Sequence, residues 1–231
     1  MKVRGDKMKK LIFLAFMLIA NVFAGETQEE ICDNKSLSYC INHYDKQCKA
    51  KNYLACLAVG ALNDEQEQYS EAKKYYEMVC DKANRQDSFQ LELIDGSMGY
   101  KVPVITSMQL SCGNLGMFYY NGKGVRQSYE KALLYWGKAC NLGNGESCSL
   151  AGFVYYYGTV LKKDLNRAVK LFIKSCESKF GFGCSMLGAL YLLGEGVKQN
   201  PSKAKELLGK ACDFGYQDGC DAYKKLKENG Y

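Results

Sequence analysis

The sequence predicts an all-α protein in which helix–turn–helix repeats stack into a solenoid. Cysteines recur in pairs eight residues apart, these pairs recur every 36 residues, and the residues between them have helical spacing. The regular pairs are Cys140 with Cys148, Cys176 with Cys184, and Cys212 with Cys220. Because a fixed period of this length indicates units that share a core with their neighbours, we expect an elongated array.

Each repeat is expected to contain two helices joined by short turns. A glycine stands four residues after the second cysteine of a pair, as Gly152 does after Cys148, which places both on one helical face. A large apolar residue and an alanine precede the next first cysteine by four and eight residues, as Phe172 and Ala168 precede Cys176. We expect these glycines and alanines to mark close contacts between helices.

A second glycine follows the first helix in three repeats, at Gly122, Gly158 and Gly194. A glycine at this place suits a C-terminal helix cap with a positive φ angle. The turns read GKGV and GEGV in two repeats but GTVL in the middle one, where Val160 replaces the next glycine, so we expect that turn to differ.

The first 24 residues have the pattern of a secretory signal peptide. Two lysines precede an apolar run over residues 11–20, and Val22 and Ala24 fit the small-residue pattern before a cleavage site. The run is too short for a permanent membrane helix, and the expected mature start, Gly25, is not a cysteine that could carry a lipid. We expect an exported protein, periplasmic or secreted, without a membrane anchor after cleavage.

Net charge gives no support for a nucleic-acid partner. The chain has a formal charge of +6, but residues 1–24 hold five Lys or Arg and one Asp, a net of +4. Residues 25–231 therefore carry only +2, and a nearly neutral exported chain has no electrostatic case for binding nucleic acid.

Beyond the signal peptide we expect a capping helical segment over 25–63 and a repeat array over 64–231 with an insertion near 84–107. The insertion carries two alternating runs around turn residues, which predicts a β-hairpin inside a helical protein. The runs are Phe89, Leu91 and Leu93, then Tyr100, Val102 and Val104, around Asp95–Gly96. This insertion is either a tolerated loop or a recognition element at the rim of the array.

Three stretches carry a family resemblance: CSLAGFVYYYG, CSMLGALYLLGEGVKQNPSKAKELLGKAC and CGNLGMFYYNGKGVRQSYEKALLYWGKAC. They resemble Sel1-like repeats, which are related to the tetratricopeptide repeat, and the added cysteine pairs resemble the cysteine-rich secreted Hcp family. The resemblance implies a right-handed superhelix whose first helices line a concave face. It also implies penicillin binding or a β-lactamase activity.

All twelve cysteines follow the predicted cleavage site, and an even number in an exported chain favours disulfides. The repeat selects neighbouring pairs, each of which clips the turn between one repeat and the next. The expected bridges are Cys32–Cys40, Cys48–Cys56, Cys80–Cys112, Cys140–Cys148, Cys176–Cys184 and Cys212–Cys220. Metal ligation and redox chemistry are the alternatives, but His43 is the single histidine and no CxxC is present, so we expect no metal or cofactor.

The implied β-lactamase activity finds no recognisable site in the sequence. The SxxK pattern of serine β-lactamases occurs three times, at Ser70–Lys73, Ser128–Lys131 and Ser202–Lys205. Each copy lies at the start of a second helix, where a serine is expected to cap free N–H groups. KTG and SDN are absent, and one histidine cannot build a zinc site. The catalytic residues of any hydrolysis therefore stay unknown.

Tyrosines are the remaining candidates for binding. Tyr119, Tyr155 and Tyr191 recur in register and are expected in the core, whereas their neighbours Tyr120, Tyr156 and Tyr157 do not recur in every repeat. We expect these three neighbours to bind a peptide, a partner protein or a cell-wall fragment in the concave groove, with simple packing as the alternative. The other functional hypotheses are β-lactam hydrolysis and a purely structural adaptor.

Overall fold

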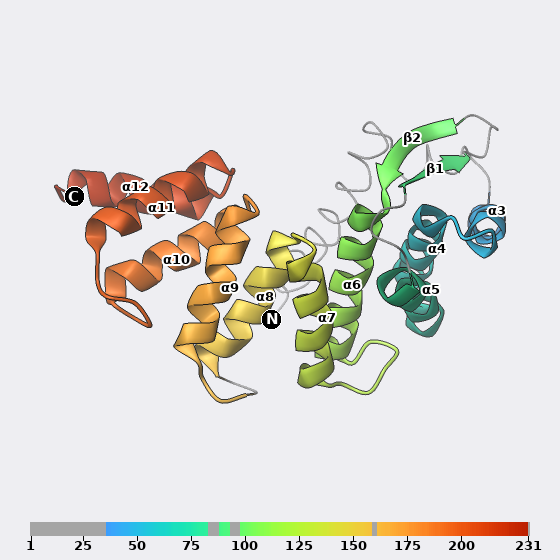
Figure 1. Cartoon of the computed structure of the whole chain (residues 1–231), viewed down its shortest axis with the longest axis horizontal. Coiled ribbons are helices and arrows are strands. Elements are labelled where there is room, and N and C mark those ends of the chain that lie inside the picture. Colours follow the sequence, from blue (N-terminus) through green and yellow to red (C-terminus); the bar gives the residue numbers. More distant parts are fainter. Residues whose placement is uncertain (1–35, 83–87, 93–97, 159–160, 231) are drawn as a thin grey trace. The chain divides into compact units, whose positions relative to one another are not determined.

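The computed structural model describes residues 36–82, 88–92, 98–158 and 161–230 (Figure 1). These residues form ten helices and one two-stranded sheet, which confirms the predicted all-α repeat fold with an inserted hairpin. None of the described helices is long and apolar enough to cross a bilayer. The predicted signal peptide, Cys32 and Val160 lie outside the described residues.

The helices come in pairs along the chain, and we call the first helix of each repeat helix A and the second helix B. Helices A are α4, α6, α8 and α10, and helices B are α5, α7, α9 and α11. The bounds are α3 Leu37–Lys49, α4 Tyr53–Glu65, α5 Tyr69–Lys82, α6 Val104–Asn121, α7 Tyr129–Asn141, α8 Gly145–Tyr157, α9 Leu165–Glu177, α10 Gly181–Leu193, α11 Pro201–Asp213 and α12 Gln217–Glu228.

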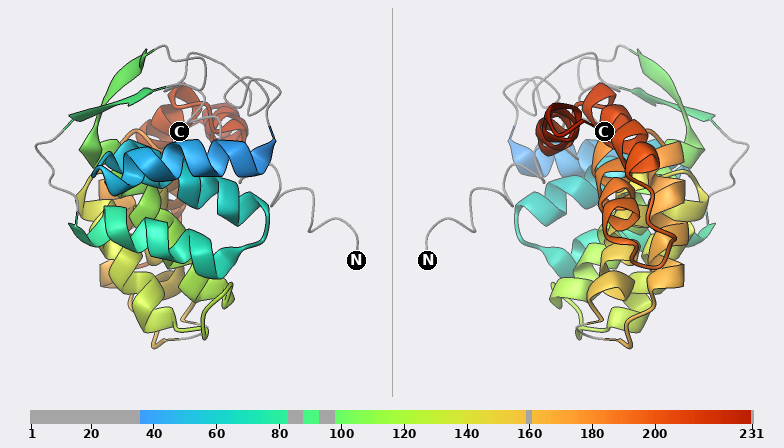
Figure 2. Two further views of the ribbon diagram at one scale, coloured as in Figure 1. Left: turned by 90° about the vertical axis from the view of Figure 1, so that its right-hand side faces the viewer. Right: turned by 90° about the vertical axis from the view of Figure 1, so that its left-hand side faces the viewer.

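The chain divides into two compact units, residues 1–111 and 112–231. In the first unit α4 contacts α3, α5 and the first strand of the sheet. In the second unit each helix from α7 to α12 packs on the next one along the chain, and the two helices A, α8 and α10, also touch (Figure 1 and Figure 2). Within the second unit, each repeat therefore packs on its sequence neighbours, as a repeat array requires.

Close contacts between helices A and B explain the recurrent glycines. Each glycine of helix A faces the large apolar side chain of the following helix B: Gly60 with Tyr76, Gly116 with Trp136, Gly152 with Phe172, and Gly188 with Leu208. A β-carbon added to Gly152 would lie 3.0 Å from the Phe172 ring, which is tighter than ordinary van der Waals contact. The predicted close approach is thus confirmed.

Glycine also ends the helices A. Gly158 and Gly194 form the C-caps of α8 and α10 with φ angles of 63° and 72°, and the N–H of each donates to a carbonyl four residues earlier. Gly122 has the same left-handed backbone, with φ at 72°. The predicted caps are confirmed, because only glycine adopts this conformation without steric cost.

Disulfides join the end of one helix to the start of the next helix along the chain. Four of the expected bridges are present, with Cα–Cα distances between 4.4 and 4.7 Å: Cys48–Cys56, Cys140–Cys148, Cys176–Cys184 and Cys212–Cys220. Cys40, Cys80 and Cys112 are also disulfide-bonded. The pairing of these three residues stays a prediction.

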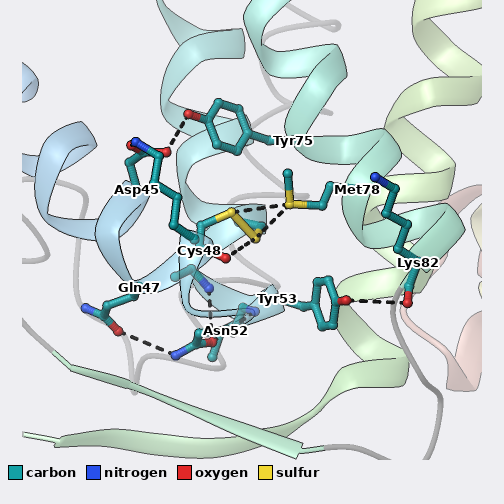
Figure 3. Close-up of a disulfide and its surroundings, with 12 residues drawn as sticks. Asp45, Gln47, Cys48, Asn52, Tyr53, Tyr75, Met78 and Lys82 are labelled. Carbon is teal, nitrogen blue, oxygen red and sulfur yellow. Dashed lines mark hydrogen bonds and ion pairs between the residues drawn. A yellow bond between two sulfur atoms is a disulfide. The ribbon is translucent and has the colours of Figure 1, made fainter.

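Figure 3 shows how the Cys48–Cys56 bridge is enclosed by α5. The thioether sulfur of Met78 lies 3.7 Å from each sulfur of the bridge. The hydroxyl of Tyr75 donates a 2.7 Å hydrogen bond to the Asp45 carboxylate on α3. This bond fastens α5 to α3 across the disulfide turn, so the covalent link and the helix contact support each other.

The predicted hairpin is present, with one correction. Strands β1 (Ser88–Glu92) and β2 (Met98–Pro103) pair antiparallel, with Phe89 opposite Val102. Val104, expected in the second strand, instead begins α6 and is buried with Met108 one turn later. The four-residue spacing of these apolar residues belongs to a helix, and Pro103 ends the strand because it has no N–H for the ladder. Leu93 and the Asp95–Gly96 turn lie outside the described residues.

Candidate interaction surface

Exposed aromatic side chains gather at the C-terminal end of α8. Phe153 and Tyr157 are one helical turn apart and point away from the helix B contact at Gly152, and they remain 40% and 52% exposed. Their ring centroids are 4.3 Å apart, and the Tyr156 ring meets Tyr157 edge-on at 4.9 Å. The last turn of this helix A thus exposes the rings of Phe153 and Tyr157 to solvent, and the half-buried ring of Tyr156 contacts Tyr157.

The next helix A extends this apolar surface. Leu193, the last residue of α10, is 63% exposed, the largest fraction among the exposed large hydrophobic side chains of the described residues. The two helices touch, and the Glu195 carboxylate, two residues beyond Leu193, lies near the Tyr156 hydroxyl. We call Phe153, Tyr157 and Leu193 together the aromatic patch.

Tyr156 and Glu195 form the polar part of the surface beside the aromatic patch. Burial, followed by the nearby Glu195 carboxylate, raises the pKa of Tyr156 above its ordinary value of 10.0. The carboxylate oxygen Oε2 of Glu195 is buried and has no hydrogen-bond partner among the described residues. An unpaired buried acceptor costs about 1–3 kcal/mol, so this oxygen is ready to accept a donor from a ligand or from water.

A lysine distinguishes the middle repeat from its neighbours. In the flanking repeats Gln127 and Gln199 donate 2.7 Å hydrogen bonds from their amides to the carbonyls of Tyr120 and Leu192, at the ends of helices A. The corresponding residue of the middle repeat is Lys163. Its ammonium nitrogen lies 5.2 Å from the centroid of the Tyr156 ring, within the range of a cation–π contact. The aromatic patch therefore has a cation at its edge.

The three predicted binding tyrosines do different things. Tyr156 and Tyr157 come together at the aromatic patch, although Tyr156 is half-buried and also packs on the core around α9 and α10. The half-buried ring of Tyr120 contacts Tyr129 and Trp136 of its own repeat, at 5.4 and 5.3 Å. Tyr157 alone of the three is exposed.

The recurrent tyrosines lie in or against the core. Tyr119 is 7% exposed and stacks on Tyr135, with ring centroids 5.5 Å apart. Tyr155 and Tyr191 are half-buried and pack against the core residues of α9, α10 and α11. The core prediction is confirmed for Tyr119, whereas the other two lie at the border between core and surface.

The serines of the three SxxK pairs lie at or near the first residues of helices B. Ser128 is the N-cap of α7, and its hydroxyl oxygen accepts a 3.3 Å hydrogen bond from the Lys131 backbone N–H. The capping prediction is wrong for Ser202, because Asn200 caps α11 from the repeat position of Ser128. It is also wrong for Ser70, the second residue of α5, since α5 begins one residue earlier.

The lysines of these pairs have contacts of their own. The Lys73 ammonium pairs with Glu77 at 2.7 Å, and the Lys131 ammonium lies over the Tyr119 ring at 5.0 Å. Across the described ranges, no three His, Cys, Asp or Glu side chains come together as metal ligands would. Nothing in this part of the chain therefore resembles the activated serine or the zinc site of a β-lactamase.

Phe153, Lys163 and Glu195 escaped the sequence analysis. Phe153 stands where the other repeats have Met117 and Ala189, so its aromatic character is peculiar to one repeat. Lys163 could have been found by comparing the three loops at one position, where the other two repeats have glutamine. Glu195 lies 39 positions after Tyr156, and no spacing rule within one repeat connects them.

Three segments match the Sel1 repeat: residues 110–144, 145–180 and 182–216. A Sel1 repeat protein from Oxalobacter formigenes is 20% identical, with a TM-score of 0.64, and the match covers 80% of this chain and 67% of that one. A protective antigen of uropathogenic Escherichia coli with an SLR fold is 18% identical, with a TM-score of 0.52, over 100% of this chain and 52% of that one.

Cysteine-rich protein B of Helicobacter pylori is 31% identical over 49% of this chain and 88% of that one, with a TM-score of 0.42. A search of the curated proteins found no match. The matched repeats are those whose glycines, caps and cysteine bridges are described above. Residues 110–216 are therefore built of Sel1 repeats, and cysteine bridges join these repeats to one another.

Proposed function

We propose that this chain is an exported binding scaffold and that the aromatic patch holds a segment of a partner protein. The disulfide-bonded Sel1 repeat is an architecture for protein–protein interaction, and its disulfides indicate an exported chain. The finer proposal concerns the place and the partner. Cleavage after Ala24, release into the periplasm or beyond, and a capping segment over 25–63 belong to the same proposal.

The observation that carries this proposal is the exposure of Phe153, Tyr157 and Leu193 on two helices A that touch. Burial of apolar surface contributes about 25 cal/mol for each Å², so burying these exposed neighbouring rings against another molecule would be favourable. Aromatic side chains with a polar edge are also the residues most enriched at protein interfaces. Covering the aromatic patch with a partner would use that surface.

The other candidate ligands have less support. A β-lactam would need a nucleophile or a metal, and the serine–lysine pairs serve as helix surface instead. A cell-wall fragment would need several polar groups directed toward one sugar, whereas three large apolar side chains dominate the aromatic patch. The exposed surface of this unit therefore favours a protein segment.

Site-specific photo-crosslinking tests the proposal. The photoreactive amino acid p-benzoylphenylalanine replaces Tyr157 in one variant and Leu134 in another, and both are expressed in the cells that export the protein. Leu134 is a matched control because it is 57% exposed but lies on α7, a helix B. We expect a discrete protein adduct from position 157 and none from position 134.

A second variant makes the result specific. Leu193→Ala removes the exposed side chain of the neighbouring helix without touching the crosslinker, so it should reduce the adduct from position 157. Mass spectrometry then identifies the crosslinked segment of the partner. Equal amounts of adduct from both positions, or an amount from position 157 that Leu193→Ala leaves unchanged, would contradict a binding role for the aromatic patch.

A further inference from the structure

The small net charge of the chain hides a strong separation of charge. Residues 112–231 hold 17 Lys or Arg and 10 Asp or Glu, a net of +7. Residues 25–111 hold 9 and 14, a net of −5. The unit that carries the aromatic patch is therefore strongly basic, although the chain beyond residue 24 is close to neutral. A surface of one sign attracts a partner of the opposite sign and speeds their association.

Much of this positive charge lies between each helix A and its helix B, in residues 122–127, 161–163 and 194–199. We call these three segments the basic loops. They contain five cations and a single carboxylate, that of Glu195; the cations are Lys123, Arg126, Lys162, Lys163 and Lys198. In Figure 1 these segments lie on the lower side of the second unit, where α8 and α10 end. Tyr157 and Leu193 are the last residues of these two helices.

The acidic groups at this end already have partners within the chain. Glu195 lies near the Tyr156 hydroxyl, and Asp164, which follows the middle loop, caps α9 and pairs with Arg167 at 3.2 Å. By contrast, Lys162 and Lys163 are exposed beside the aromatic patch. Carboxylates brought by a partner would meet these cations without displacing a buried pair, which makes the contact favourable.

We infer that the partner segment is an acidic peptide in which Asp or Glu residues flank apolar side chains. This inference rests on the proposed function, since it assigns a chemistry to what the aromatic patch binds. The apolar side chains of the peptide cover Tyr157 and Leu193, and its carboxylates lie against the basic loops. A backbone N–H of the peptide can also donate to the unpaired Oε2 of Glu195.

A peptide meets all three demands together. The aromatic patch requires apolar side chains, the basic loops require carboxylates at a spacing of a few residues, and Glu195 requires a donor. A sulfated polysaccharide or a nucleic-acid strand supplies the negative charge but not aliphatic side chains. The aromatic patch, Glu195 and two of the basic loops lie at the ends of the same two helices A, α8 and α10, so one extended segment can contact all three features.

The test measures binding of defined polymers to the oxidised chain without its signal peptide. A fluorescent copolymer of glutamate and tyrosine is the probe, and polyglutamate, a lysine–tyrosine copolymer and heparin are the comparisons. Fluorescence anisotropy gives each dissociation constant at several salt concentrations. We expect the glutamate–tyrosine copolymer to bind most tightly and to weaken as salt rises, because ion pairs at exposed sites are screened.

Two charge-matched variants locate the contact. Lys162→Gln with Lys163→Gln neutralises the middle loop, and Lys170→Gln with Lys179→Gln removes the same charge elsewhere in the unit. Lys170 is exposed on α9, and Lys179 lies in a turn at the opposite end of the helix pairs. We expect the first pair of changes to weaken binding by on the order of five-fold and the second to leave it unchanged.

A variant that removes the aromatic patch distinguishes failure of this inference from failure of the proposed function. If Tyr157→Ala with Leu193→Ala weakens binding but the loop variant matches its control, the aromatic patch binds a partner and the acidic chemistry is wrong. Equal affinity for polyglutamate or heparin would overturn the inference in favour of simple polyanion binding. Tighter binding of the lysine–tyrosine copolymer, or no binding of any polymer, would overturn it as well.

Discussion

Replacing Gly116 by alanine tests the explanation of the recurrent glycines most sharply. Gly116 lies on α6 directly against the indole of Trp136 on α7, and an added β-carbon would overlap three ring atoms, including Cγ at 2.8 Å. Trp136 is only 1% exposed and is one of the largest fully buried side chains in the described residues. The ring cannot move outward without opening the contact between the two helices.

The size of the effect follows from two opposing contributions. Alanine is a better helix former than glycine by about 1 kcal/mol, which favours the variant. Forcing an extra carbon into a filled core costs about 1–3 kcal/mol, and a rigid indole in contact at three atoms places Gly116 at or above the upper end. We expect a net loss of about 2 kcal/mol, or a fall in Tm of roughly 4–8 °C for a chain of this size.

Gly137→Ala is the control, because a β-carbon at that position of α7 meets nothing within 4 Å. Without an overlap, only the helix propensity remains, so this variant should be more stable by about 0.5–1 kcal/mol. Urea unfolding followed by circular dichroism, with the disulfides intact, measures both variants. If Gly116→Ala were as stabilising as the control, the close-contact explanation of the recurrent glycines would be refuted.

Three further predictions concern the disulfides and two ionisable groups. Replacing Cys176 and Cys184 together by serine should lower the free energy of unfolding in urea by about 2.5 kcal/mol, and no change would contradict a role in stability. Burial raises the pKa of Glu146 above its usual 4.5, so its contribution is present below that pH and lost as pH rises through the folded-state pKa. Glu146→Gln should therefore raise Tm at neutral pH and have little effect in acid; an equal effect at both would contradict the burial. Burial and the hydrogen bond to Asp45 raise the pKa of Tyr75 from 10.0 to about 12. The chain should lose stability between pH 10 and 12, and Tyr75→Phe, which lacks the ionisable hydroxyl, should show a smaller loss in alkaline melting curves, since Tyr156 and Tyr216 also have raised pKa values.

The features that could be predicted from the sequence are those that every repeat copies. A glycine must recur wherever a Trp136-like side chain crosses a helix, and a left-handed cap must recur wherever a helix A ends, as at Gly194. Cysteines eight residues apart bridge a short turn whatever the rest of the fold. Each of these constraints acts over fewer than about ten residues or between helices adjacent in sequence, so periodicity is enough to reveal it.

The errors in the prediction arose where two local signals compete. Ser202 and Asn200 both suit the start of α11, and the choice depends on where the helix begins, which Pro201 decides by favouring the first helical position. Val104 fits a strand by alternation and a helix by its four-residue spacing to Met108. Burial of the helical face decides between them, and burial depends on the surrounding fold.

The candidate site could be predicted only in part, because its main contact joins different repeats. The tyrosines at the end of α8 were identifiable from their failure to recur, and Tyr157 is indeed exposed. The approach of Glu195 to Tyr156 depends on α10 lying against α8, which requires the stacked fold. The basic loops were also missed, because a single net charge averages over two halves of opposite sign.

Departures from the repeat indicate function because folding does not require them. Gln127 and Gln199 hold the ends of helices A in the flanking repeats, so a glutamine at position 163 would be the simplest choice for stability. The middle repeat gives up that hydrogen bond for the exposed cation of Lys163, and its helix A carries exposed rings at the same end. The middle repeat thus lacks a stabilising hydrogen bond and exposes apolar rings at the same end of its helix A. Both features lower the stability of the fold, so selection for folding alone would remove them. Selection for a bound partner would keep them.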